Sequence, residues 1–359
     1  MKVKQSLFLA LIASTTLLTS CNFMSDKVLK PGTLYKGGTE IDIDEFDSRI
    51  TKALKTKEDI ENLNGFFNIK KYYIEDNSEY DGNQMYKKVN STLSVNGNID
   101  FAFNSINDDE NITACINFND LNYSEYTVED LHNKMSNAKG QKTSENEYKN
   151  VNVSMYFSDK KLYLNMQNGY SVSFVEDFLG IKNIHYYRSY VSNVKLTFNM
   201  KELINYNSLT YYKLKDYKEM FNNSIKFVGY GEKGFGLSFS ITQDKMFNDI
   251  INHTLLENGL SKDDLTSEQL NNLKDMMNEL KELYQINKLK ASLYFDIEKG
   301  RLEESIDIDY KLQSEEIKSD SYEKYSEKMI YNMSSCIKFE PGKIQFPSDL
   351  AEYHKIMYY

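Results

Sequence analysis

The stretch Val151–Met166, VNVSMYFSDKKLYLNM, alternates apolar and polar side chains on both sides of a short turn. Its apolar positions are Val151, Val153, Met155 and Phe157 before the turn, and Leu162, Leu164 and Met166 after it. Successive side chains of a strand point to opposite faces, so a period of two places all of these on one face. Asp159-Lys160-Lys161 supplies the turn. The stretch therefore predicts an antiparallel hairpin with one buried face.

Short alternating segments recur on both sides of this hairpin, between residues 66 and 241. Leu93–Val95 and Ile99–Phe103 flank Asn96-Gly97, a dipeptide typical of hairpin turns. A second clear hairpin is predicted over Leu289–Leu312, with its turn at Lys299-Gly300. Strands joined by such short turns favour a largely antiparallel sheet.

Helices are predicted in three weaker places and two stronger ones. The weaker candidates are residues 41–63, a tyrosine-rich stretch over 203–221, and a short helix over 127–135 that is followed by a polar loop to Asn150. The stronger ones form a pair within residues 243–287. Apolar residues recur at helical spacing from Met246 to Leu256, and Thr266 with Gln269 makes a capping box for the second helix. Strands around an embedded helical pair predict the α+β class.

Composition limits the possible functions. The chain has 359 residues, 40% of them hydrophobic and 13% aromatic, which is enough to build one large core or two interlocked ones. Its formal net charge is −10 and it has no long basic run, so we expect no nucleic-acid partner.

Cysteines and histidines are few. Cys115 and Cys336 could pair as a disulfide, or each could be a small buried side chain in an alternating strand. None of the four histidines lies two to four residues from another histidine or a cysteine, so no zinc signature forms. The carboxylate pairs Asp42/Asp44 and Asp307/Asp309 lack the rest of a calcium loop and are interpreted as solvated charge. We expect neither a metal nor a cofactor.

One motif has the letters of a dinucleotide-binding fingerprint. Residues 229–234, GYGEKG, match GxGxxG, but the following residues alternate as a strand where the fingerprint needs a helix. A glycine-rich hairpin turn is therefore the better interpretation. No hydrolase elbow or zinc-protease motif occurs, so we expect the chain not to be an enzyme, and an anchored hydrolase is the least favoured function.

The first 21 residues, MKVKQSLFLALIASTTLLTSC, combine Lys2 and Lys4, an apolar run and a cysteine preceded by small residues. The apolar run is too short to span a bilayer, so a transmembrane helix is the weaker interpretation. The stretch resembles the signal and lipobox of bacterial lipoproteins. That resemblance implies a signal peptide over 1–20, lipidation of Cys21, a tether through residue 40, and a single domain over 41–359 facing the extracytoplasmic side of a cell membrane.

The order of elements in the mature chain also resembles the LolA/LppX-like lipoproteins. The resemblance lies in Cys21, the two hairpins, the helical pair and the closing segment Ile344-Gln345-Phe346-Pro347. It implies a curved, half-barrel-like antiparallel sheet covered by the pair of helices, with a cavity for acyl chains between them. The residues expected to line that cavity are Met155, Leu164, Phe247, Ile251, Met277 and Phe295, although the same residues would form plain core if the space is filled.

Two functional hypotheses follow. The first is a membrane-anchored binding module, and its more specific form takes a hydrophobic or lipid-like ligand. The second is a surface-displayed interaction or adhesion lipoprotein with no small-molecule ligand. The sequence does not identify its protein partner. The abundant tyrosines, 28 in all, suit either one if they line a cleft, because they offer an apolar ring and a polar tip. Filling a core without tryptophan is their plainer role.

Overall fold

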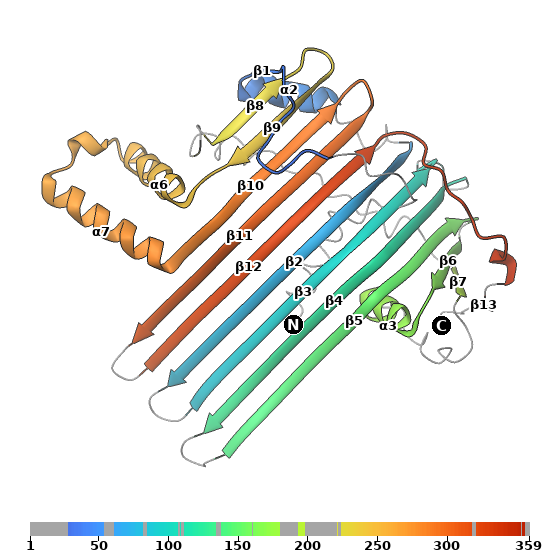
Figure 1. The fold of residues 1–359 in the computed structure, drawn as a ribbon, viewed down its shortest axis with the longest axis horizontal. Coiled ribbons are helices and arrows are strands. Elements are labelled where there is room, and N and C mark those ends of the chain that lie inside the picture. The colour runs from blue at the N-terminus through green and yellow to red at the C-terminus, as the bar shows by residue number, and fades with distance from the viewer. Residues whose placement is uncertain are drawn as a thin grey trace.

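The computed structural model describes residues 28–53, 61–81, 85–106, 108, 111–133, 138–159, 161–179, 193–197, 221, 224–317, 321–352 and 354–355. These residues form one large, open sheet of 13 strands with helices at its margins (Figure 1). The α+β class with a curved, largely antiparallel sheet is thereby confirmed.

The strands are β1 (Thr39–Glu40), β2 (Leu63–Asp81), β3 (Met85–Asn104), β4 (Thr113–Asn133), β5 (Ala138–Ser158), β6 (Lys161–Met166), β7 (Asn193–Thr197), β8 (Ile225–Gly229), β9 (Gly234–Ser240), β10 (Tyr284–Asp296), β11 (Arg301–Ile317), β12 (Ser321–Lys338) and β13 (His354–Lys355). The α-helices are α2 (Ile43–Ala53), α3 (Gly169–Leu179), α6 (Gln243–Glu257) and α7 (Ser267–Leu283), and two single 3₁₀ turns are Lys262–Asp264 and Leu350–Glu352.

The strand order is β1-β8-β9-β10-β11-β12-β2-β3-β4-β5-β6-β7-β13. Neighbouring strands pair antiparallel, except that β13 runs parallel to β7. Both predicted hairpins are confirmed. In the first, Met155 of β5 lies opposite Leu164 of β6. In the second, Asp296 of β10 lies opposite Arg301 of β11, and Gly300 takes a positive φ of 53° in the turn.

The two faces of the sheet differ. We call the face that carries Phe67, Phe101, Met155 and Phe235 the core face, and the opposite one the outer face. The core face bears both hydrophobic clusters of the described residues: a large one centred on β2–β6, against which α3 packs, and a smaller one centred on β8–β10, against which α2 packs. These clusters hold one half of the sheet together, because burial of apolar area is the main stabilising term.

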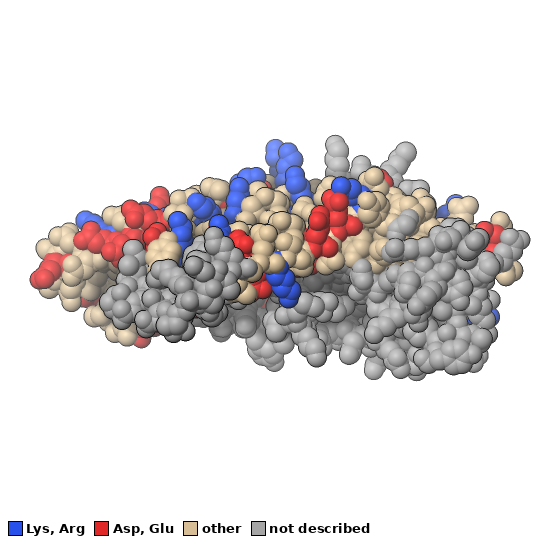
Figure 2. All heavy atoms as spheres, turned by 90° about the horizontal axis from the view of Figure 1, so that it is seen from below, with Lys and Arg blue, Asp and Glu red and all other residues tan. Residues whose placement is uncertain are grey.

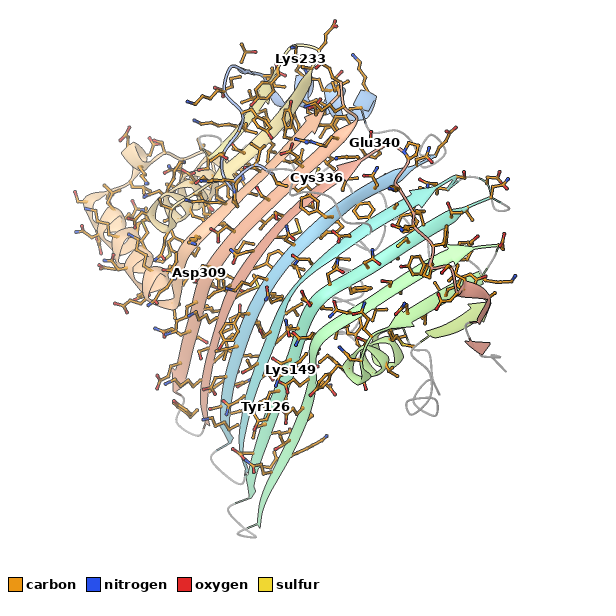
Figure 3. The ribbon with its side chains drawn as sticks, turned by 45° about the vertical axis from the view of Figure 1, so that its right-hand side comes forward. Tyr126, Lys149, Lys233, Asp309, Cys336 and Glu340 are labelled. Atoms are coloured by element: carbon orange, nitrogen blue, oxygen red, sulfur yellow. The ribbon has the colours of Figure 1, made fainter. Side chains whose placement is uncertain are left out.

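The other half of the sheet differs in its burial. It comprises residues 71–81, 85–94, 122–133, 138–150, 307–317 and 321–331, and we call it the single-layer region. From 71 to 78, each side chain of β2 is half-buried whichever face it points to, whereas residues 151–157 of β5 alternate between buried and half-buried. Apart from Phe174 of α3, whose ring contacts Tyr148, and the end of α7, which contacts β11 at Gln313, no described helix packs over this region. Figure 3 shows side chains standing out along its strands, with Tyr126 and Lys149 toward that end and Cys336 and Glu340 toward the other.

β-Bulges on β4 and β5 mark the boundary between the two halves, and Gly97 of β3 lies opposite the bulge of β4. The register shifts between Asn96 and Asn98 in β3, and around Asp120 in β4, which has a φ of 50°. Asn150 of β5 has a φ of 48°. The amides of Asn122 and Asn152 satisfy this backbone: Asn122 accepts from the N–H of Asn150, and Asn152 accepts from that of Asp120. Bulges increase local twist and bend, so a row of them divides the sheet.

Three predictions between residues 85 and 150 are wrong. Asn96-Gly97 lies inside β3, opposite a bulge of β4, and not at a hairpin turn. The segment predicted as a helix over 127–135 continues β4 through Asn133, and most of the expected polar loop is strand β5. Polar residues dominate these segments because neither face is fully buried there, so the apolar periodicity of a strand is missing.

The helical pair is confirmed as an element. Thr266 and Gln269 form the predicted capping box of α7, and Gly259 follows α6 with a φ of 69°. Its placement differs from the expectation that it covers the sheet: α6 and α7 project beside β10, outside the outline of the long strands (Figure 1). Each of the two helices begins with a capping residue, and such a cap can be recognised from neighbouring residues alone. The position of the helical pair against the sheet depends instead on which strand edge its connecting loops reach.

The chain ends also differ from expectation. Residues 28–40, predicted as tether, bind the outer face: Leu29 is buried, and the Ser292 hydroxyl donates to the carbonyl groups of Lys30 and Thr33. Helix α2 is shorter than the predicted 41–63, and β2 begins at Leu63. The segment after β12 is an extended arm, as predicted, held where Asn104 donates to the carbonyl of Gly342.

Candidate binding surfaces

The helical pair has an apolar stripe that the fold leaves partly uncovered. Helix α7 has 17 residues and none of them is buried. Its stripe of Leu270, Leu273, Met277 and Leu280 is half-buried. In α6 only Phe247 and Ile251 are buried. Apolar stripes normally stabilise a helix by packing against another element, so this one is available for a further apolar contact.

Exposed apolar residues extend this surface. Leu256 at the end of α6 is 69% exposed, and Leu260 and Tyr284 are also exposed. Phe247 packs edge-on against the Tyr284 ring, with 6.4 Å between centroids. The pair is joined to the sheet by Gln243, whose side-chain oxygen accepts from the N–H of Ile286 at 2.6 Å. The hydrogen bond of Gln243 to Ile286 thus fixes the helical pair to strand β10.

A second surface lies on the core face of the single-layer region, and we call it the tyrosine–glutamate strip. It comprises Tyr73, Tyr123, Tyr310 and Tyr325 with Glu75, Glu125 and Glu327. The Glu327 carboxylate accepts from the hydroxyl groups of Tyr310 at 2.6 Å, Tyr325 at 2.5 Å and Tyr73 at 3.1 Å. Strands β2, β11 and β12 bring these groups together because they are neighbours in the sheet.

The pKa shifts fit this geometry. Burial raises the pKa of Glu327, but the hydrogen bonds from the three tyrosines outweigh it and hold the pKa below its usual range. Burial, followed by the hydrogen bond to Glu327, raises the pKa of Tyr325 to about 12. The hydroxyls therefore stay protonated donors and the carboxylate stays charged at neutral pH. The strip offers aromatic rings beside fixed negative charge, a combination that suits cationic or amphipathic ligands.

The structure separates the six residues predicted to line a cavity. Met155 and Leu164 are buried in the larger cluster, and Phe295 is buried in the smaller one. Phe247, Ile251 and Met277 lie on the helical pair. Sequence periodicity identified the residues of the helical pair, but it missed the tyrosine–glutamate strip. The signal of the strip is a tyrosine and a glutamate two positions apart on one strand, as in Tyr123 and Glu125. Seven of the chain's tyrosines lie between residues 186 and 217, and these and the predicted lipidation residue Cys21 lie outside the described residues.

The remaining sequence features have plain structural roles. Cys115 and Cys336 are buried and form no disulfide with each other. Their strands β4 and β12 are separated by β2 and β3, about 14 Å across the sheet, which is beyond disulfide reach. The GYGEKG motif is the turn between β8 and β9, as expected. In the described part of the chain, no group of three or more metal-binding side chains converges, and no helix is long and apolar enough to cross a membrane.

Comparisons with known proteins add little. No protein-family model matches the chain, and no curated protein matches it. Two solved chains match. One is the crystal structure of a Pseudomonas aeruginosa FadL homologue, 7% identical over 79% of this chain and 92% of that chain, with a TM-score of 0.13. At this TM-score the similarity carries no argument about fold or ligand.

Proposed function

We propose that the chain is a membrane-anchored, extracytoplasmic lipoprotein that acts as a binding module, taking a hydrophobic or lipid-like ligand on the helical pair. The anchor rests on the lipobox-like stretch ending at Cys21. The ligand rests on one observation: α7 carries a continuous apolar stripe and has no buried residue. A bound acyl chain would cover that stripe, and each methylene buried would contribute about 0.8 kcal/mol.

Native mass spectrometry of the full chain, expressed with Cys21→Ser so that no anchor is attached, tests the ligand. Acyl species that co-purify and leave only on denaturation would support it. The neighbouring methionines provide matched variants: Met277→Gln changes the stripe, whereas Met276→Gln changes an exposed residue beside it. Met277→Gln should weaken binding of added phosphatidylglycerol about tenfold and Met276→Gln by less than about twofold. Equal effects, or a clean mass with no lipid uptake, would reject the helical site.

The anchor has its own readout. Wild-type protein should fractionate with membranes and incorporate labelled palmitate, and Cys21→Ser should do neither. Two acyl chains give stable anchoring where one gives only marginal binding. Retention of the Cys21→Ser variant on membranes would contradict the lipid anchor without affecting the ligand experiment.

The second candidate, a surface-displayed interaction lipoprotein, is supported by the tyrosine–glutamate strip. Its aromatic and acidic character suits a basic partner. A decalysine peptide should bind the wild type, and Glu125→Lys should weaken that binding about tenfold. The control Glu298→Lys changes an exposed acid in the β10–β11 turn and leaves the strip intact. Equal loss in both variants would indicate attraction to net charge alone.

A further inference from the structure

Most edges of the sheet are short or covered, so they cannot pair with a strand of another chain. The outermost strands β1 and β13 have two residues each. Beyond the end of β9, the free side of β10 is blocked by the helical pair, since Gln243 accepts from Ile286 N–H and donates to the carbonyl of Lys281. Short strands and covering helices are established ways of preventing a sheet edge from pairing with another chain.

The edge of β5 is an exception among the described strands. On one side β5 pairs with β4 along its length, but on the other side β6 reaches only from Val153 to Ser158. At residues 150–152 the start of α3 contacts the edge, where Asn168 donates to the carbonyl of Asn150. From 138 to 149 no described strand lies beside β5, and residues 140–147 are exposed. This edge is about 40 Å long at about 3.3 Å per residue.

We propose that this edge of β5 pairs with the same edge of a second copy, antiparallel and two-fold symmetric about Thr143. The two-fold axis then stands perpendicular to the joined sheet, so paired residues lie on the same face and their numbers add to an even total. The charges along the edge select among these registers, because like charges directly opposite each other are destabilising.

Registers centred on Lys142, Glu145, Asn146 or Glu147 oppose lysine to lysine or glutamate to glutamate. A register centred on Ser144 opposes Lys139 to Lys149. Centred on Thr143, the strand opposes Gln141 to Glu145 and Lys139 to Glu147, each twice by symmetry. Lysines on an edge discourage pairing with apolar strands. In this register Lys139 has Glu147 opposite it and Lys142 has Ser144, so no lysine meets another lysine and the edge favours its own copy.

Cysteine cross-linking of the full chain tests the register. Thr143→Cys places two cysteines directly opposite each other, and mild oxidation should yield a disulfide-linked dimer. Gln141→Cys is the matched control: it is exposed on the same face, but the two copies lie about 13 Å apart along the strand, beyond disulfide reach. Dimer from Thr143→Cys alone is expected. No dimer, or equal yields from both variants, would overturn the proposal.

Charge exchange tests the same interface without cysteine. By sedimentation of the full chain carrying Cys21→Ser, Lys139→Glu and Glu147→Lys should each raise the dimer dissociation constant at least about tenfold, and the double variant should restore it to within about threefold. A wild type that stays monomeric at about 100 μM, or a double variant as weak as the single ones, would contradict the pairing.

Discussion

Neighbouring glutamates of β11 show how one residue step changes the environment of a carboxylate. Glu303 points to the outer face and is fully buried beneath the N-terminal segment. It accepts from the N–H of Leu29 at 3.2 Å and from the hydroxyl of Tyr35, and it pairs with Arg301. Glu304 points to the core face, where burial raises its pKa and the Ser335 hydroxyl partly offsets that shift. One carboxylate is well paired and the other is poorly solvated.

Glu303→Ala should destabilise the protein by about 3 kcal/mol, because it leaves the largely buried Arg301 guanidinium without this carboxylate and releases Leu29 and Tyr35. The urea midpoint measures the loss. Limited proteolysis should show earlier cleavage near residues 28–36. Glu298→Ala, which changes an exposed acid in the preceding β10–β11 turn, is the control and should change stability by less than about 0.5 kcal/mol.

Glu304→Gln should stabilise the protein at pH 7. A carboxyl whose folded-state pKa is raised costs stability above that pKa, and the cost disappears as pH falls toward the pKa of the unfolded chain. Glutamine can still accept the Ser335 hydrogen bond and carries no charge. Urea unfolding at pH 7 and about pH 4 should show a gain that shrinks at the lower pH. A larger gain at pH 4 would contradict the assigned shift.

At the scale of elements, the neighbouring bulges mark where the half of the sheet that carries the hydrophobic clusters ends and the single-layer region begins. Their positions could not be predicted, because Asn96-Gly97 has the letters of a hairpin turn and only its pairing with β4 shows that it lies within a strand, opposite a bulge. A Cβ atom added at Gly97 would lie 2.7 Å from the Leu121 Cα atom. The neighbouring bulge of β4 therefore requires a residue without a side chain at this point.

Gly97→Ala should lower the free energy of unfolding by about 1–3 kcal/mol, because backbone must move to admit the methyl group. Gly140→Ala is the matched control within the sheet. A Cβ atom at Gly140 meets nothing within 4 Å, so we expect a change below about 0.5 kcal/mol. Thermal unfolding of both variants makes the comparison. Equal effects would indicate a general cost of alanine in these strands.

For the whole molecule, stability should be graded along the strands. Strand β12 pairs with β11 and β2 over its full length, so its hydrogen bonding is uniform. Its packing is not: residues 335–337 are buried, whereas residues 323–328 lie in the single-layer region and are half-buried or exposed. Charged side chains of both signs are interspersed along the described layer when it is viewed toward the ends of these strands (Figure 2).

Hydrogen exchange should separate these halves. Amides at 335–337 should exchange at least about tenfold more slowly than those at 323–328. Opening the strands around 335–337 exposes the hydrophobic core to water, whereas opening the single-layer region does not. Mass spectrometry of exchanged peptides from β12 gives both rates in one strand. Equal rates would show that the sheet opens as one cooperative unit.

Elements whose signals are local could be predicted from the sequence alone. The hairpins over 151–166 and 289–312 follow from alternation, and the start of α7 follows from its capping box. Helical spacing also placed Phe247, Ile251 and Met277 on the apolar faces of the helical pair. Three features required the folded chain: where the helical pair lies, that 113–133 is uninterrupted strand, and that Tyr73, Tyr310 and Tyr325 share one carboxylate. Those features depend on strand neighbours far apart in sequence, and periodicity reports burial without naming the partner that causes it.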